Sequence, residues 1–272
     1  MYLYDLNMTV EQAETAIGPL LREWRNRRKI SQLDLSIDAD ISSRHLSFVE
    51  TGRSKPSRDM VLRLADRLEI PLRERNQLML AAGFAPAYTR LDLDDAGMSP
   101  IKAAIEQVLT AYEPFPALVV DRGWHLVAAN ASLPMLLAGL PDELLAPPVN
   151  VLRASLHPDG LAPRIANLAE WRGHVLERLG REIAVTASEE LRELYDELAA
   201  YPGGTEPGAP EGQIAVPMRV RTDAGELTFV STVTTFGTAV DVTLAELSIE
   251  AFLPANAETA AALRVMGETI GA

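Results

Sequence analysis

The sequence predicts an all-α N-terminal domain followed by an α+β domain with a five-stranded antiparallel sheet and a helical insert. Three observations carry this prediction. Residues 17–83 show only helical periodicity, with apolar side chains three and four positions apart between caps and Gly or Pro stops. Residues 117–130 and 213–253 contain runs typical of strands, and the chain between them has a helical pattern. Residues 84–99, rich in Asp, Pro and Gly, indicate a linker.

The predicted organisation has four parts: an N-terminal lead (1–16), a five-helix domain (17–83), the linker (84–99) and the α+β domain (100–272). Within the last part, two strands around the turn Arg122-Gly123 form an expected hairpin. Pro217 lacks a backbone donor, so its strand is expected at the edge of the sheet or at a bulge. The five expected strands are 117–121, 124–130, 213–221, 226–235 and 245–253.

Composition narrows the functional classes. The chain of 272 residues has no Cys, so it has neither disulfides nor thiolate sites. It has no apolar run of about 18 residues and no basic N-terminal signal, so we expect a cytoplasmic protein outside the membrane. The four His residues show no metal-ligand spacing, and no Gly-rich phosphate loop precedes a helix. We therefore expect no catalytic residues, no metal and no enzyme.

Charge is divided unevenly along the chain, whose net charge is −13. Residues 17–90 carry 14 Lys and Arg against 9 Asp and Glu, whereas residues 91–272 carry 11 against 26. A basic module on an acidic body is typical of a nucleic-acid-binding domain attached to a domain of another kind. The acidic body is expected to weaken non-specific binding to nucleic acid.

Residues 31–52 look like two short helices joined by a tight turn. Ser31 and Ser42 are expected N-caps, and Asp40 stands where the chain must turn and tolerates a left-handed conformation. At 100° per residue, Leu46, Val49 and Glu50 share the inner side of the second helix. Its outer side has one Arg, short hydroxyls, an aromatic ring and no acid, which suits phosphates and base edges of duplex DNA: Ser43, Arg44, Ser47, Phe48 and Thr51.

Residues 17–70 resemble the Cro/repressor-type helix-turn-helix domain of the XRE family, through the spacing Arg25…Ser31-Gln32…Leu35…Ala39…Ile41-Ser42…Leu46…Val49-Glu50…Gly52. The resemblance implies an ion pair between Arg25 and Glu50, and the inward position of Glu50 independently calls for a cation. It also implies a phosphate contact at Gln32. The other predicted DNA-binding residues are base-edge readers at Ser43, Arg44 and Phe48, backbone contacts at Thr51, Arg53 and Lys55, and Ser42 and Ser47 on the same surface.

Two of these residues leave alternatives open. Phe48 either touches a thymine methyl group or packs against the first helix or a dimer partner. Arg44 either binds a guanine through two hydrogen bonds or contacts a phosphate.

The C-terminal domain contains three characteristic stretches: Pro116…Asp121…Trp124…Asn130, Asn150…His157-Pro158-Asp159-Gly160-Leu161, and residues 227–244. Through these stretches it resembles the MmyB-like regulator family, in which a fatty acid is a known type of ligand, and its expected strands follow the order of PAS domains. The resemblance implies a cavity for a fatty acid or another small apolar ligand, whereas composition alone favours an ordinary packed core. The carboxylate of such a ligand would need a hydrogen-bond donor, and the helical insert offers four candidates: His157, Arg164, His174 and Arg178. The alternative for each of them is a surface or structural role.

Together, these features predict a ligand-responsive transcriptional regulator that binds double-stranded DNA as a homodimer, with no cofactor other than a possible fatty-acid effector. Two alternatives stay open at this stage. One is a protein-interaction module that uses the helix-turn-helix. The other is an enzyme that acts on a small apolar metabolite.

Overall fold

The computed structural model describes residues 17–206, 215–223 and 225–270, so the predicted N-terminal lead, residues 1–16, lies outside the described residues. The chain divides into two compact units. The first contains the described residues up to Arg90, and the second contains most of the chain from Leu91 onward.

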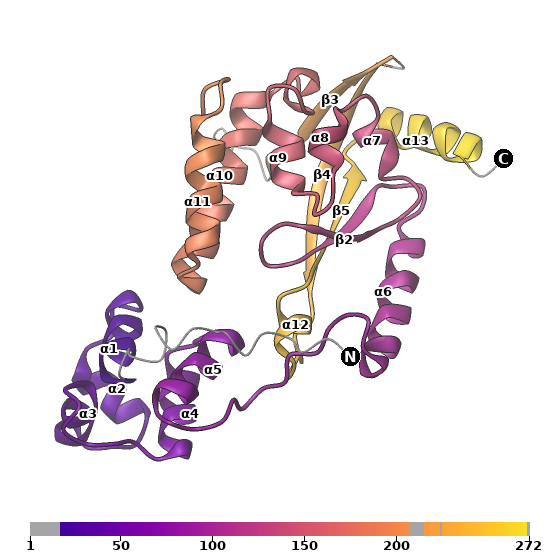
Figure 1. Cartoon of the computed structure of the whole chain (residues 1–272). Coiled ribbons are helices and arrows are strands. Elements are labelled where there is room, and N and C mark those ends of the chain that lie inside the picture. Colours follow the sequence, from indigo (N-terminus) through magenta and orange to yellow (C-terminus); the bar gives the residue numbers. More distant parts are fainter. Residues whose placement is uncertain (1–16, 207–214, 224, 271–272) are drawn as a thin grey trace. The chain divides into compact units, whose positions relative to one another are not determined.

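The first unit is a bundle of five helices, as predicted (Figure 1). Three of them start at serine caps, which include the predicted Ser31 and Ser42: the side chains of Ser31, Ser42 and Ser57 each accept a hydrogen bond from the backbone N–H three residues later. These caps satisfy N–H groups that have no partner inside the helix. The helices are α1 (Ile17–Arg27), α2 (Gln32–Asp38), α3 (Ser43–Glu50), α4 (Arg58–Arg67) and α5 (Leu72–Ala81).

The turn between α2 and α3 has the predicted left-handed residue, since Asp40 has a φ of 52°. Helix α1 approaches the end of α3 closely at Gly18. A Cβ atom there would lie 2.6 Å from the carbonyl oxygen of Val49, so only glycine fits without a shift of the backbone. Leu35 and Leu46 are fully buried between the helices. The position of α3 is therefore fixed by close packing on two sides.

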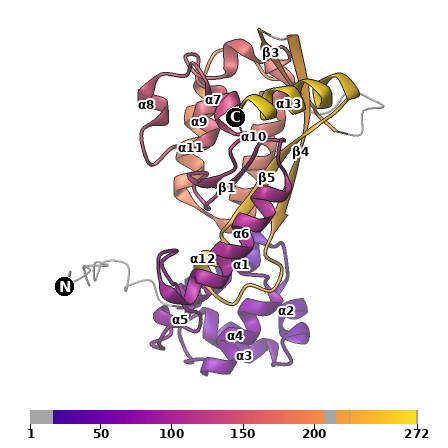
Figure 2. The same ribbon diagram turned by 90° about the vertical axis from the view of Figure 1, so that its right-hand side faces the viewer.

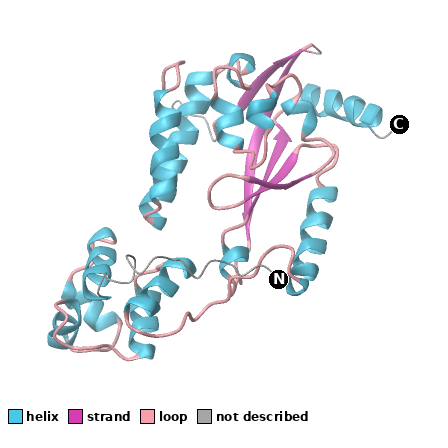
Figure 3. Cartoon of the chain, in the orientation of Figure 1, coloured by secondary structure: helices cyan, strands magenta, loops and turns pink. Residues whose placement is uncertain are grey.

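The second unit contains the sheet drawn in magenta in Figure 3. Its five strands have the order β2-β1-β5-β4-β3, and every neighbouring pair is antiparallel. This confirms the predicted sheet. Strand β3 lies at the edge, and Pro217 directly precedes it, as its missing donor requires. The strands are β1 (Ala117–Val120), β2 (Leu126–Ala129), β3 (Met218–Thr222), β4 (Gly225–Thr235) and β5 (Ser248–Pro254).

A helical insert separates β2 from β3, also as predicted. It comprises α7 (Pro134–Leu137), α8 (Asp142–Leu145), α9 (Val151–Leu156), η3 (Ala162–Arg164), α10 (Leu168–Thr186) and α11 (Glu189–Ala200). The remaining elements are η2 (Ala96–Met98) and α6 (Ser99–Ala111) before the sheet, α12 (Val242–Ala245) before β5, and α13 (Ala257–Ile270) after it.

The two faces of the sheet carry different helices, as the two views in Figures 1 and 2 show. On one face, Leu118 of β1 and Phe252 of β5 share a core with the helices of the insert. On the opposite face, Val119 and Ile249 pack against α6. This alternation follows the two-residue period of a strand, and it places the insert over the face from which Leu118 and Phe252 project.

Three predicted boundaries in this unit were wrong. The strand expected from residue 245 begins at Ser248, because Ala245 ends the short helix α12. The periodicity of residues 164–180 predicts a helix that starts at Arg164, but the helix begins at Leu168, because Ile165 forms an antiparallel bridge with Val220 and the side chain of Asn167 hydrogen-bonds the backbone of Pro217 and Arg219. The strand expected from residue 213 begins at Met218. Local helical periodicity could not reveal this pairing, since both partners are distant in sequence.

Candidate functional site

The outer side of α3 and the turn that follows it form a surface rich in hydroxyl and cationic groups. Its side chains are exposed except for Ser47 and Phe48, which are half-buried. Among the described residues, no acidic side chain forms an ion pair with its three cations. We call this set the recognition surface: Ser42, Ser43, Arg44, Ser47, Phe48, Thr51, Arg53 and Lys55.

Phe48 lies between two guanidinium groups of the recognition surface. The Cζ atom of Arg44 is 5.3 Å from the centre of its ring and that of Arg53 is 5.9 Å away. Both distances lie in the range of cation–π attraction. The ring therefore orders two cations on the outer side of the helix, which is a third role beside the two expected from the sequence.

Glu50, on the inner side of α3, is held by a set of donors. Its carboxylate accepts hydrogen bonds from Nε and Nη2 of Arg25 at 2.7 and 3.0 Å, and from the amide nitrogen of Gln32 at 2.7 Å. Arg25 in turn donates to the carbonyl oxygen of Ile30. The side chain of Gln32 thus supports the ion pair in this structure, and its phosphate contact stays a prediction.

The protonation of Glu50 reflects these donors. Burial alone would raise the pKa of its carboxyl group, but the hydrogen bonds from Arg25 and Gln32 outweigh burial and lower the pKa below its ordinary value. The same pair raises the pKa of Arg25. Both groups are therefore charged at neutral pH, and α1, α2 and α3 are joined at one point.

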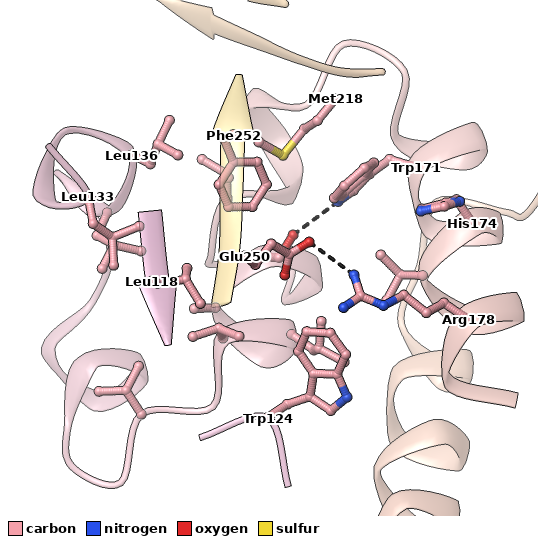
Figure 4. Close-up of a pocket in the computed structure, with 18 residues that line it drawn as sticks. Leu118, Trp124, Leu133, Leu136, Trp171, His174, Arg178, Met218, Glu250 and Phe252 are labelled. Atoms are coloured by element: carbon pink, nitrogen blue, oxygen red, sulfur yellow. Dashed lines mark hydrogen bonds and ion pairs between the residues drawn. The ribbon is translucent and has the colours of Figure 1, made fainter. Parts of the chain in front are cut away.

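The second unit encloses a cavity of about 60 Å³ between the sheet and its helical insert (Figure 4). A water molecule needs about 10–15 Å³ of such space, so the cavity is several times larger than a single water site. Its walls are largely apolar side chains from β1, β3, β5 and the insert, among them Leu118, Leu133, Leu136, Leu152, Leu161, Val175, Met218 and Phe252.

A charged pair interrupts the apolar wall. Glu250 of β5 points across the cavity toward α10, where Nη1 of Arg178 donates to its Oε1 atom at 3.0 Å (Figure 4). Arg178 also lies 3.4 Å from Glu182, and its guanidinium stacks 4.3 Å above the ring of Trp124. The indole N–H of Trp124 donates to Glu182 at 2.9 Å. One cation is thus shared by two carboxylates.

Two further polar groups line the cavity. His174 lies beside Trp171, with 5.5 Å between ring centres. Burial lowers the pKa of His174, and Arg178 and Arg181 lower it further, so the imidazole is neutral near pH 7. The indole N–H of Trp171 donates to the hydroxyl of Ser155 at 3.2 Å.

The structure separates the four predicted ligand residues. His174 and Arg178 line the cavity, whereas His157 and Arg164 do not. The ring of His157 packs edge-on against Tyr201, and Nη1 of Arg164 donates to the carbonyl oxygen of Ala138 at 2.9 Å. These contacts give both of the latter residues a structural role.

Comparison with known protein families gives two matches. Residues 101–266 match the MmyB-like transcription regulator ligand binding domain. The chain belongs to this family. Residues 16–78 match a helix-turn-helix domain family. A comparison with curated proteins found no match.

The two matches are the domain pair that the sequence resemblance predicted. This member of the MmyB-like family therefore joins a DNA-binding helix-turn-helix domain to a small-molecule-binding domain, the arrangement of a ligand-responsive transcription regulator. Within the described part of the chain, no group of three His, Asp or Glu side chains is placed to hold a metal, and no helix has the length and apolarity that a membrane span requires.

Sequence reasoning missed Glu250, which is the acidic member of the cavity wall in this MmyB-like domain. The sequence did carry a signal. Glu250 stands between Ile249 and Ala251 in a run with apolar residues on both sides, which marks a strand buried on both faces. A charge in such a strand must be paired or functional.

Proposed function

We propose that this chain regulates transcription by binding a two-fold DNA operator with an affinity that changes when a fatty acid or a similar apolar molecule occupies the cavity. The observation that carries the proposal is the cavity itself, which lies in the matched ligand-binding domain and has walls of Leu, Val, Met and Phe. Such walls favour an acyl chain. The choice of a fatty acid rests on the family resemblance.

The size of the cavity supports a coupling between ligand and conformation. About 60 Å³ accommodates the head of an acyl ligand and few of its carbons, so a longer chain requires the insert to move away from the sheet. Leu152 of α9 and Val175 of α10 line the cavity from the insert, which is the part that would move away from the sheet. A ligand that binds the expanded state better shifts the population toward it.

The DNA side of the proposal rests on the recognition surface. Helix α3 is expected to enter the major groove with Arg44 and Phe48 toward the bases, and with Arg53 and Lys55 toward the backbone. In a homodimer, the two copies of α3 would read half-sites about 34–36 Å apart. The basic character of residues 17–90 supports this role.

Two experiments test the proposal. Native mass spectrometry of the purified chain reports a retained ligand and the number of subunits together, and we expect a dimer that carries an apolar small molecule or takes one up when it is added. Selection from random duplexes should return a two-fold sequence, bound with strong dependence on salt. A monomer without affinity for apolar compounds contradicts the ligand and dimer parts. Absence of salt-dependent DNA binding would favour a protein-interaction module instead.

A further inference from the structure

The acidic wall of the cavity determines which head group a ligand can present there. Glu250 is 5% exposed and stands on the face of β5 that looks into the cavity, between the side chains of Leu118 and Phe252 (Figure 4). The hydroxyl of Ser231 and the guanidinium of Arg178 both favour the charged form of this carboxyl group and so oppose the rise in its pKa that burial causes. Glu250 is therefore an acidic hydrogen-bond acceptor that faces the ligand space.

Among the described residues that line the cavity, the charges around Glu250 leave no cation available for an anionic ligand. Arg178 already donates to Glu250 at 3.0 Å and lies 3.4 Å from Glu182, so one positive charge faces two carboxylates. His174, which lines the same cavity, is neutral near pH 7 because its pKa is lowered. The residues opposite Glu250 on the two flanking strands are both apolar: Leu118 of β1 and Val233 of β4.

A second negative charge brought to this site would be costly. It would lie among partly buried groups whose summed charge is already zero or negative, and the cost of desolvating the new charge would add to the repulsion. By contrast, a buried ion pair contributes little to stability compared with apolar packing, so a pair kept in a ligand cavity is better explained by recognition than by folding.

We propose that Glu250, oriented by Arg178, anchors the ligand by accepting a hydrogen bond from a head group that carries no negative charge. This inference rests on the proposed function and specifies its ligand class: apolar molecules with a hydroxyl, or acids that bind in their neutral form. A fatty acid then enters with uptake of one proton, which the two carboxyl groups share. Burial raises the pKa of Glu250, and this supports a proton held between them.

The test compares three matched ligands on the full chain by calorimetry between about pH 6 and about pH 8: dodecanol, dodecyl methyl ether and dodecanoic acid. We expect dodecanol to bind with little pH dependence and at least about tenfold more tightly than the ether, which has no donor. The apparent Kd of dodecanoic acid should rise about tenfold for each pH unit, because one proton is taken up on binding.

Glu250→Gln supplies a second, independent readout. Removing this acid leaves Arg178 with Glu182 alone, so the pH slope for dodecanoic acid should become shallower and its affinity at the alkaline end should increase. Glu177→Gln is the matched control, since Glu177 is an exposed residue of the same helix that pairs with Arg181. It should leave all three ligands unaffected.

The outcomes separate this inference from the proposed function. A pH-independent dodecanoate complex that is tighter than the dodecanol complex in the wild-type chain would overturn the anchor and assign Arg178 to the anion, while the proposed function would stand. Absence of binding by all three compounds, with the chain folded, would remove the apolar ligand and with it this inference.

Discussion

Glu50, the last residue of α3, accepts hydrogen bonds from two nitrogen atoms of Arg25 in α1, at 2.7 and 3.0 Å. The side chain of Glu50 is fully buried and that of Arg25 is 11% exposed, so water screens the pair weakly. The helix that presents the recognition surface is thus tied to the rest of its domain at its C-terminal end, while Ser42 caps the other end.

Glu50→Ala should lower the free energy of local opening of α3 by about 3–5 kcal/mol, because it leaves Arg25 partly buried without its counter-ion. Hydrogen exchange of α3 amides in the full chain, followed by mass spectrometry, measures this change. Glu23→Ala is the control, since Glu23 forms an exposed ion pair with Arg27 and should cost less than about 1 kcal/mol. Equal protection in the two variants would contradict the structural role of the pair.

The same carboxylate predicts a pH dependence. The pKa of Glu50 in the folded chain lies below its ordinary value of 4.5, so its contribution to stability is fully present above that value and is lost as pH falls through the folded pKa. Protection of α3 should therefore decline below about pH 4.5. The Glu50→Gln variant should be less stable than the wild-type chain at neutral pH, and its α3 protection should decline less steeply as the pH falls. Parallel pH profiles for the two proteins would show that another group is responsible.

Arg44 and Lys55 should differ in the kind of affinity they supply. Arg44→Ala is expected to cost about 1–3 kcal/mol on the selected operator and to relax preference at one base pair. Lys55→Ala should weaken all duplexes alike and reduce the salt slope by about 1. Fluorescence anisotropy at several salt concentrations measures both, with the exposed Arg67 as the control position. An equal loss for Arg44→Ala on random DNA would make Arg44 a phosphate contact.

Phe48→Leu tests whether the ring orders its two guanidinium neighbours. Leucine keeps an apolar contact but removes both cation–π interactions, each worth about 0.5–1 kcal/mol at an exposed site. We expect a loss of about 1–2 kcal/mol on the operator. In a double-mutant cycle with Arg44→Ala, the double variant should lose less binding free energy than the two single variants lose together. Additive losses would mean that the ring acts alone on a base.

Filling the cavity should separate ligand response from DNA binding. Ala154 is a buried residue of α9 that lines the cavity, so Ala154→Phe is expected to occupy the space and to destabilise the domain by about 1–3 kcal/mol through overpacking. Operator binding without ligand should be retained. Ala261→Phe, at an exposed position of α13, controls for the added ring. An unchanged ligand response in Ala154→Phe would place the ligand elsewhere.

Local chemistry made the helical domain predictable. Three serine caps, the left-handed Asp40 and the inward turn of Glu50 are all readable within a few residues of sequence. The order of elements in the second domain was equally readable, and Pro217 marked the edge strand because a missing donor excludes it from the interior of a sheet.

The cavity was less predictable, because it depends on pairings between distant segments. Glu250 meets Arg178 only when β5 is central in the sheet and α10 lies over that face. His157 and Arg164 resembled ligand residues because their type suits a carboxylate, and only the fold shows that neighbouring groups already engage them. The residue types were compatible with binding a carboxylate, but the sequence does not show in which direction these side chains project.

The most direct test of the account is the affinity of the full chain for its selected operator, measured with and without saturating dodecanol, in the wild-type protein and in Ala154→Phe. The account predicts that ligand changes the operator Kd at least about fivefold in the wild-type chain, the lower limit of ordinary coupling energies, and leaves it unchanged in the variant. Identical Kd values in the wild-type chain with and without a demonstrably bound ligand would contradict it.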